Sequence, residues 1–168
     1  MLTPRRPPRS RRARTTVQAR LDEGQAFFGQ KKWDEALAAH RAAVEKDPEM
    51  SVAWYGIGAA EVAKNGVCEA AHDPLKRCVE LDPDNAGAHY GLGRVLLYVR
   101  EDDVRAEEHF RAATRLDPNF APAHSGLAAI LQMRGDLDGA IRAMCDCCLL
   151  YTSPSPRDAT LSRMPSSA

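Results

Sequence analysis

Histidine and cysteine are the side chains in this sequence best suited to bind a metal or act as a base or nucleophile. The 168-residue chain has five of each. A zinc site or a catalytic pair needs such residues at fixed spacings, for example two histidines one helical turn apart. No histidine is spaced in this way, and Glu107-Glu108-His109 lacks the second histidine of a zinc-protease helix. The five histidines are His40, His72, His89, His109 and His124.

The cysteines give an equally weak chemical signal. Cys145-x-Cys147 resembles half of a metal site but has no partner pair elsewhere, and Cys78 fits a small buried position. The sequence also lacks a phosphate-binding glycine loop, a Gly-x-Ser-x-Gly motif and carboxylates paired in a credible site. We therefore expect a protein that is not an enzyme, with no catalytic residue, metal or cofactor.

Charge argues against a nucleic-acid groove, and the length of the apolar runs argues against a membrane-spanning helix. Residues 21–147 carry 14 Lys and Arg against 22 Asp and Glu, so this part is acidic although the whole chain is neutral. A nucleic-acid groove needs clustered cations to neutralise phosphates, so we expect no nucleic-acid partner. The longest apolar run, Val95–Val99, is far shorter than the roughly 20 residues of a membrane-spanning helix.

A repeated motif organises the middle of the chain. Asp-Pro recurs at Asp47-Pro48, Asp82-Pro83 and Asp117-Pro118, at intervals of 35 residues, and each follows a stretch with helical periodicity. Proline cannot continue a helix and disfavours the α conformation in the residue before it, so each motif predicts a helix end. A repeat of this length indicates a stack of similar units rather than a single globular core.

The segments between these prolines resemble tetratricopeptide repeats. They match the pattern of a tryptophan, a leucine-glycine pair and a tyrosine, followed by an alanine, a phenylalanine and a proline. The matching residues are Gly24, Phe27, Ala36, Ala43 and Pro48; Trp54, Ile57, Gly58, Ala71, Leu75, Cys78 and Pro83; Leu92, Gly93, Ala106, Phe110, Ala113 and Pro118; and Leu127, Ala128, Leu131, Ala140 and Met144.

This resemblance implies an all-α fold, an α-solenoid of stacked antiparallel helix pairs with three full repeats and a truncated fourth. Small residues let the two helices of a pair approach, and neighbouring pairs bury one another's apolar faces. We expect the solenoid to span residues 17–147. Its repeats are predicted at about 17–50, 51–85, 86–120 and 121–147.

Two departures from the family pattern predict local irregularity. One extra residue must lie in the turn between helices, with Asn65-Gly66 and Glu101-Asp102-Asp103 as suitable places. Pro74 falls inside the expected second helix of the second repeat, where a proline costs roughly 3 kcal/mol. We therefore expect a separate helical turn followed by a shortened helix, with Asp73 as N-cap and Pro74 as its first residue.

In this family the first helix of each repeat lines a concave groove, and one stripe of its side chains points into that groove. Tyrosine and arginine in such a stripe are typical binding anchors. For each tyrosine, packing between helices is the alternative. Transferred to this chain, the stripe predicts a peptide-binding groove containing Gln25, Phe28, Tyr55, Tyr90, Arg94, Tyr98 and Gln132, with Val62, Ser125 and Ala129 beside them.

One tetratricopeptide subfamily binds acidic chaperone tails through a clamp of Lys, Asn and Arg. The matching positions here lack these side chains, so we expect no chaperone tail to bind. Glycines also replace the asparagine ladder of the sugar-transferase relatives, at Gly56, Gly91 and Gly126. The residues at the clamp positions are Leu21, Gln25, Gly56, Gly87 and Gly91.

Both ends differ in composition from the middle. Residues 1–16 are rich in Arg and Pro and are predicted to be disordered, as a solvated tail, an organelle-targeting leader or translated non-coding sequence. Residues 148–168 are also predicted to be disordered. They resemble one reading frame of a sequencing adapter, which would make them read-through from library construction, with a genuine Ser/Pro-rich tail as the alternative.

The function expected from these features is protein–protein interaction, with a peptide or protein partner in the concave groove. One alternative is the N-terminal, substrate-positioning region of a larger transferase or hydroxylase whose catalytic domain lies beyond this chain. Another is a structural array that self-associates through its last repeat. The sequence does not identify the partner; the expected location is the cytoplasm, with an organelle as the alternative.

Overall fold

The computed structural model describes the backbone of residues 9–152 and the side chains of residues 16–145. The described backbone forms helices and no strand, which confirms the all-α prediction. The helices are α1 (Arg9–Gly29), α2 (Trp33–Lys46), α3 (Ser51–Asn65), the short 3-10 helix η1 (Glu69–Ala71), α4 (His72–Leu81), α5 (Ala86–Tyr98), α6 (Asp103–Leu116), α7 (Ala121–Met133) and α8 (Leu137–Thr152). None of them has the length and hydropathy needed to cross a bilayer.

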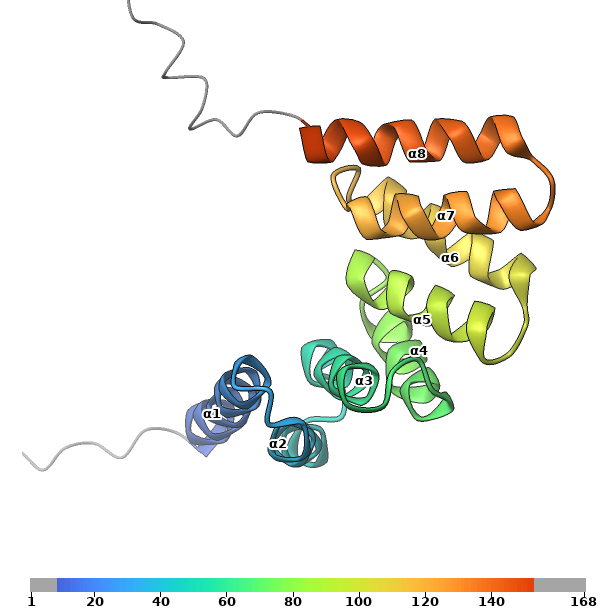
Figure 1. Ribbon diagram of the computed structural model, residues 1–168. Coiled ribbons are helices and arrows are strands. Elements are labelled where there is room, and N and C mark those ends of the chain that lie inside the picture. Colours follow the sequence, from blue (N-terminus) through green and yellow to red (C-terminus); the bar gives the residue numbers. More distant parts are fainter. Residues whose placement is uncertain (1–8, 153–168) are drawn as a thin grey trace, which may run out of the picture.

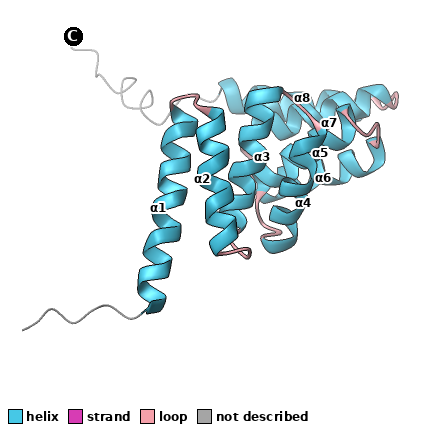
Figure 2. Cartoon of the chain, turned by 90° about the horizontal axis from the view of Figure 1, so that it is seen from below, coloured by secondary structure: helices cyan, strands magenta, loops and turns pink. Residues whose placement is uncertain are grey.

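Consecutive helices pair and the pairs stack into an arc, as Figure 1 shows. In Figure 2 the helices α1 and α2 run side by side over most of the length of α2. Each odd-numbered helix also contacts the next odd-numbered one, whereas among the described helices no even-numbered one contacts the next even-numbered one. The odd-numbered helices therefore line the inner side of the arc. This is the predicted α-solenoid.

The Asp-Pro motifs end the even-numbered helices as predicted. The backbone N–H groups of Asp47, Asp82 and Asp117 donate the last hydrogen bond of α2, α4 and α6, and each aspartate leaves the helical conformation, with a φ between −132° and −142°. The carbonyl of the following proline then accepts a hydrogen bond from the next odd-numbered helix. The three pairs are Trp54 Nε1 to Pro48 at 2.8 Å, His89 Nε2 to Pro83 at 3.1 Å, and His124 Nε2 to Pro118 at 3.0 Å.

Pairs of glycines allow close packing between the first and second helices of the solenoid. Gly93 and Gly126 lie on either side of the Phe110 ring, and a Cβ added to either glycine would lie within 3.0 Å of Phe110 Cε1. The same arrangement occurs twice more, since Leu75 lies between Gly58 and Gly91 and His40 lies between Gly24 and Gly56. We call His40, Leu75 and Phe110 the wedge positions, because the side chain of each extends from an even-numbered helix and lies between two odd-numbered helices.

The second repeat has the predicted irregularity. The 3-10 helix η1 supplies a separate turn, and α4 is short. The assignment of Asp73 as N-cap is wrong, because α4 begins at His72 and the Asp73 carboxylate instead contacts His72 Nδ1 at 2.8 Å. Pro74 is therefore the third residue of α4 and not the first. It is tolerated there because the first-turn N–H groups of a helix have no partner within the helix.

The predicted turns at the extra residues are confirmed by their backbone conformations. Gly66, directly after α3, has a φ of 74°, and Glu101, between α5 and α6, has a φ of 55°. A positive φ is accessible to glycine without a steric penalty, whereas glutamate adopts it at some cost. Each extra residue therefore lies in the turn after a first helix, α3 or α5. The part of each helix that lines the groove is not shifted by it.

The helices extend past two predicted domain boundaries. The helix α1 begins at Arg9, within the segment 1–16 that was expected to be disordered. No proline follows Pro8 there, and Arg and Ala favour helices. The helix α8 likewise continues through residues 148–152 and stops before Pro154. Residues 1–8 and 153–168, including most of the adapter-like segment, lie outside the described residues.

Three exposed ion pairs link successive repeats at equivalent positions. Lys64 at the end of α3 contacts Asp34 near the start of α2, with 2.5 Å between Nζ and Oδ1. Arg100, just after α5, contacts Glu69 in η1, and Arg134, just after α7, contacts Asp103 at the start of α6. We call these contacts the junction ion pairs, because each connects the first helix of one repeat to the second helix of the repeat before it.

Candidate peptide-binding groove

Two adjoining recesses occupy the inner side of the arc. The first, of about 250 Å³, lies between α3 and α5 and is lined by Phe28, Tyr55, Tyr90 and Arg94 together with small residues of both helices. The second, of about 210 Å³, lies between α1 and α3. Phe28, Tyr55 and Ala59 line both recesses, so the two form one continuous groove.

Aromatic contacts hold Tyr90 in the α3–α5 recess. Its ring lies 5.9 Å from the Phe110 ring and 5.3 Å from the Phe120 ring, the latter edge-on. The Arg94 guanidinium, one helical turn further along α5, lies 5.7 Å from the centre of the Tyr90 ring. A cation over an aromatic face is attracted by the ring quadrupole. The recess therefore presents a positioned cation beside an apolar surface.

Tyr55 lies at the meeting point of the two recesses. Its hydroxyl approaches Gly87 so closely that an added Cβ would lie 2.7 Å from the oxygen. Burial, with a smaller contribution from the nearby Cys78 thiol, raises the pKa of Tyr55, because the phenolate would lose its hydration. Tyr55 is therefore a neutral hydrogen-bonding group on an apolar wall. Gly87 is what allows α5 to pass it.

The α1–α3 recess has a different floor. It is lined by Gln25, Phe28, Val52, Tyr55 and Ala59, together with Gly56 and the almost fully buried His40. Only 2% of His40 is exposed, and its Nδ1 atom is buried without a hydrogen-bond partner. Burial lowers the pKa of His40, which keeps the imidazole neutral at pH 7.

Five of the seven predicted groove residues line the two recesses, and two do not. Gln25, Phe28, Tyr55, Tyr90 and Arg94 are brought together, whereas Tyr98 is 62% exposed near the end of α5 and Gln132 is exposed near the end of α7. Three further residues were predicted beside the groove. Val62 lines the α3–α5 recess, whereas Ser125 and Ala129 line neither recess.

The sequence prediction missed the residues that form the groove's floor. Gly58, Gly87 and Gly91 line the α3–α5 recess together with Leu75. His40 was interpreted as a packing residue of a second helix, which is correct for its burial but omits its place in the α1–α3 recess. The glycine pairs spaced around each wedge position were the signal that would have identified this floor.

His89 and His109 contact one another between α5 and α6. His89 Nε2 donates to the Pro83 carbonyl, so His89 Nδ1 accepts, and it lies 2.9 Å from His109 Nδ1, which must then donate. Burial, then the neighbouring His89 and His72, lowers the pKa of His109 to about 4. Burial also lowers the pKa of His89. This arrangement orients two neutral rings between α5 and α6.

Burial limits the reactivity of the Cys78 thiol. Burial, followed by the charge of Asp82, raises the pKa of Cys78 to about 11, so its thiol stays protonated and a poor nucleophile. Among the side chains of residues 16–145, no three His, Cys, Asp or Glu residues are placed to hold a metal ion. The clamp positions carry no cation either, since Leu21 is buried and Gly56, Gly87 and Gly91 pack against neighbouring side chains.

Stacked helix pairs with an apolar inner groove define a repeat scaffold of the helical-hairpin class. The tetratricopeptide repeat family model matches residues 21–77 and 63–119, together more than half of the chain. The chain belongs to the tetratricopeptide repeat family. No curated protein matches the sequence.

Solved structures with the same fold include a peptide-bound tetratricopeptide domain and part of a transferase. The crystal structure of MamA is 23% identical, with a TM-score of 0.71 over 86% of this chain and 81% of that chain. The first tetratricopeptide domain of Spaghetti (RPAP3), bound to the HSP90 peptide SRMEEVD, is 20% identical, with a TM-score of 0.66 over 72% and 94%. A Thermobaculum terrenum O-GlcNAc transferase mutant is 27% identical, with a TM-score of 0.64 over 77% and 23%.

Proposed function

We propose that the groove formed by the two recesses binds an extended peptide segment of a partner protein. The observation that carries this proposal is the convergence of Phe28, Tyr55, Tyr90 and Arg94, from three successive first helices, on one continuous apolar groove. Large aromatic side chains with a neighbouring arginine are the residue types that dominate binding energy at interfaces. The family and the fold of the similar structures support a scaffold that binds proteins.

A peptide-display screen on the whole chain, followed by fluorescence polarisation with the selected peptides, tests this function. We expect micromolar dissociation constants that rise at least tenfold in Arg94→Ala. Arg94→Lys keeps the charge but loses the planar group that lies over Tyr90, so an intermediate effect is expected. Unchanged affinity in Arg94→Ala would contradict the proposed groove.

Two controls separate binding from folding. Tyr90→Phe keeps the ring that packs on Phe110 and Phe120 but removes the hydroxyl, so a loss of affinity in this variant cannot come from lost packing. Val104→Ala changes an exposed residue on α6, which does not line the groove, and should leave affinity unchanged. The peptide SRMEEVD should not bind, because the clamp positions hold a buried leucine and glycines.

A second candidate function is substrate positioning within a larger enzyme. The O-GlcNAc transferase resemblance favours it, since this chain covers 77% of its own length but 23% of that chain. In that case the groove would hold the protein substrate for a catalytic domain beyond this chain. Sequencing the transcript past Cys147 tests the idea: a transferase or hydroxylase domain in frame supports it, and a stop codon directly after a capping helix contradicts it.

A further inference from the structure

Arg94 is the only charged side chain among the described residues that line the two recesses. The other lining residues are apolar, aromatic or uncharged polar, and burial keeps His40 neutral. Arg94, Val62 and Tyr90 are each partly exposed, so a ligand in the α3–α5 recess can reach all three. The recess therefore presents an apolar wall with one accessible guanidinium group.

Arg94 differs from most arginines of residues 16–145 in having no carboxylate partner. Arg134, for example, forms an ion pair with Asp103 at 3.1 Å. The Arg94 guanidinium lies over the Tyr90 ring and forms no ion pair or hydrogen bond with another described residue. Its N–H donors are therefore available to a ligand.

A carboxylate is the ligand group that complements an arginine on an apolar wall. The planar guanidinium can donate two parallel hydrogen bonds to the two carboxylate oxygens, and the opposite charges strengthen both bonds. A cationic group would be repelled at this place. A neutral group would displace water from the guanidinium without supplying a counter-charge.

The charge of the whole solenoid limits how many carboxylates the ligand can carry. Residues 21–147 carry 14 Lys and Arg against 22 Asp and Glu. One carboxylate placed beside Arg94 meets a cation, whereas further acidic groups meet a surface of their own sign. Arg94 also lies three residues after Gly91 and is not a clamp position. This site therefore differs from the clamp that binds acidic chaperone tails.

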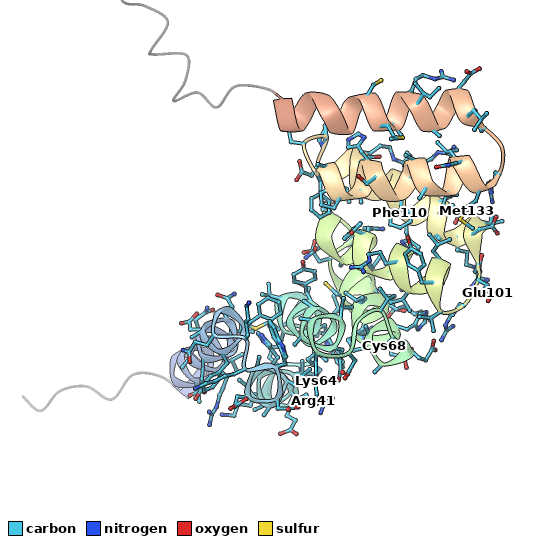
Figure 3. All side chains as sticks on the ribbon, in the orientation of Figure 1. Arg41, Lys64, Cys68, Glu101, Phe110 and Met133 are labelled. Atoms are coloured by element: carbon cyan, nitrogen blue, oxygen red, sulfur yellow. The ribbon has the colours of Figure 1, made fainter. Side chains whose placement is uncertain are left out.

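We propose that the α3–α5 recess binds a single Asp or Glu side chain of the partner peptide through Arg94, with a neighbouring apolar side chain of that peptide against Val62. This proposal rests on the proposed peptide-binding function and names the chemistry of one subsite. The Tyr90 ring under the guanidinium is held in turn by Phe110, which is labelled in Figure 3. Because the arginine is already positioned, binding a carboxylate costs less side-chain entropy.

Two glutamine variants separate this subsite from a general effect of charge. Arg94→Gln removes the cation, while glutamine keeps hydrogen-bonding capacity and a similar helix propensity. Arg115→Gln is the matched control, because Arg115 is exposed on α6, forms no ion pair with a described side chain and lies outside both recesses. Both variants change the net charge of the chain by the same amount.

The first measurement selects peptides from one random library with the wild type and the two variants. We expect the wild-type and Arg115→Gln pools to be enriched in Asp or Glu at one position beside an apolar residue, at least fivefold over the Arg94→Gln pool. The apolar preference should be shared by all three. Equal acidic enrichment in all pools, or none in the wild-type pool, overturns this inference and leaves the groove function standing. A wild-type chain that selects no peptide overturns both.

The second measurement applies fluorescence polarisation to the best peptide and to a copy in which its acidic residue is replaced by the matching amide. The replacement should lower the affinity of the wild type and of Arg115→Gln at least tenfold, and that of Arg94→Gln less than twofold. A second acidic residue added next to the first should weaken binding to the wild type. Equal losses in the wild type and Arg94→Gln would overturn the pairing of Arg94 with the carboxylate.

Discussion

The junction between the first two repeats and the junction between the last two are built alike but filled differently. At the later junction Phe110 lies between Gly93 and Gly126, and its ring also contacts Tyr90 of the groove. At the earlier junction His40 lies between Gly24 and Gly56, with a buried ring nitrogen that has no hydrogen-bond partner. The side chain at the later junction stabilises the packing of the repeats through apolar contacts. The polar side chain at the earlier junction stabilises it less.

The largest effect is expected from emptying the later junction. Phe110→Ala removes a fully buried ring between two glycines that cannot fill the space, so we expect the free energy of unfolding to fall by about 3–5 kcal/mol. Urea denaturation followed by circular dichroism measures it. Phe110→Leu should cost about 1 kcal/mol, because Leu75 occupies an equivalent position. A loss below 1 kcal/mol in Phe110→Ala would show that the junctions carry little stability.

Overfilling the same junction is expected to have the next largest effect. In Gly126→Ala the new Cβ would lie 2.7 Å from Phe110 Cε1, so the ring must move, at a cost of about 1–3 kcal/mol. Gly29→Ala is the matched control because nothing lies within 4 Å of its added Cβ. That substitution should leave stability unchanged or raise it by up to about 1 kcal/mol. Equal effects of the two substitutions on the urea midpoint would refute the close-packing argument.

The earlier junction should respond to pH. Because the pKa of folded His40 is lowered, the unfolded chain binds a proton near pH 6.5 that the folded chain does not bind, and wild-type stability falls as pH decreases below about 6.5. His40→Phe removes this term and the unsatisfied nitrogen, so it should be about 1 kcal/mol more stable at pH 7.5. The difference should widen between pH 6.5 and 5.

Urea midpoints of both chains at pH 7.5, 6 and 5 measure this difference. His89 and His109 also have lowered pKa values, so they destabilise both chains in acid, and only the gap between the chains reports His40. A gap that stays constant over this range would mean that His40 takes up its proton equally in the folded and unfolded states.

The smallest effect is expected at Tyr98. Its side chain is 62% exposed and lies outside both recesses, so Tyr98→Ala should change stability by no more than about 0.5 kcal/mol. Peptide affinity should also stay within twofold of the wild type by fluorescence polarisation. A larger loss of affinity would extend the groove along α5 beyond Arg94.

The sequence predicts the architecture well because the relevant signals are local and repeated. Asp-Pro fixes where each second helix ends, and the small residues fix where helices approach. The inner stripe was also predictable from Phe28 to Arg94, since residues one turn apart share a helix face. Tyr98 and Gln132 lie in the last turn of α5 and α7 and outside both recesses, so their place in the groove stays a prediction.

The role of His40 could not be predicted from its repeat position alone. That position indicates burial, which is correct, but the open space beside the ring depends on Gly56 and Gln25 from two other helices. Asp73 was predicted wrongly for a different reason: whether a residue is an N-cap depends on the exact residue at which the helix begins. The 3-10 turn of η1 shifted that register by two residues, so that α4 began at His72.

The junction ion pairs give the superhelix a property that its apolar core does not have. Each connects two successive repeats, and the side chains that form them are 35–75% exposed. Electrostatic attraction at such a surface is screened within about 8 Å at physiological salt and 3 Å at 1 M. The angle between successive repeats should therefore vary more at high ionic strength. In 1 M salt, small-angle X-ray scattering should record a broader spread of end-to-end distances at unchanged helix content.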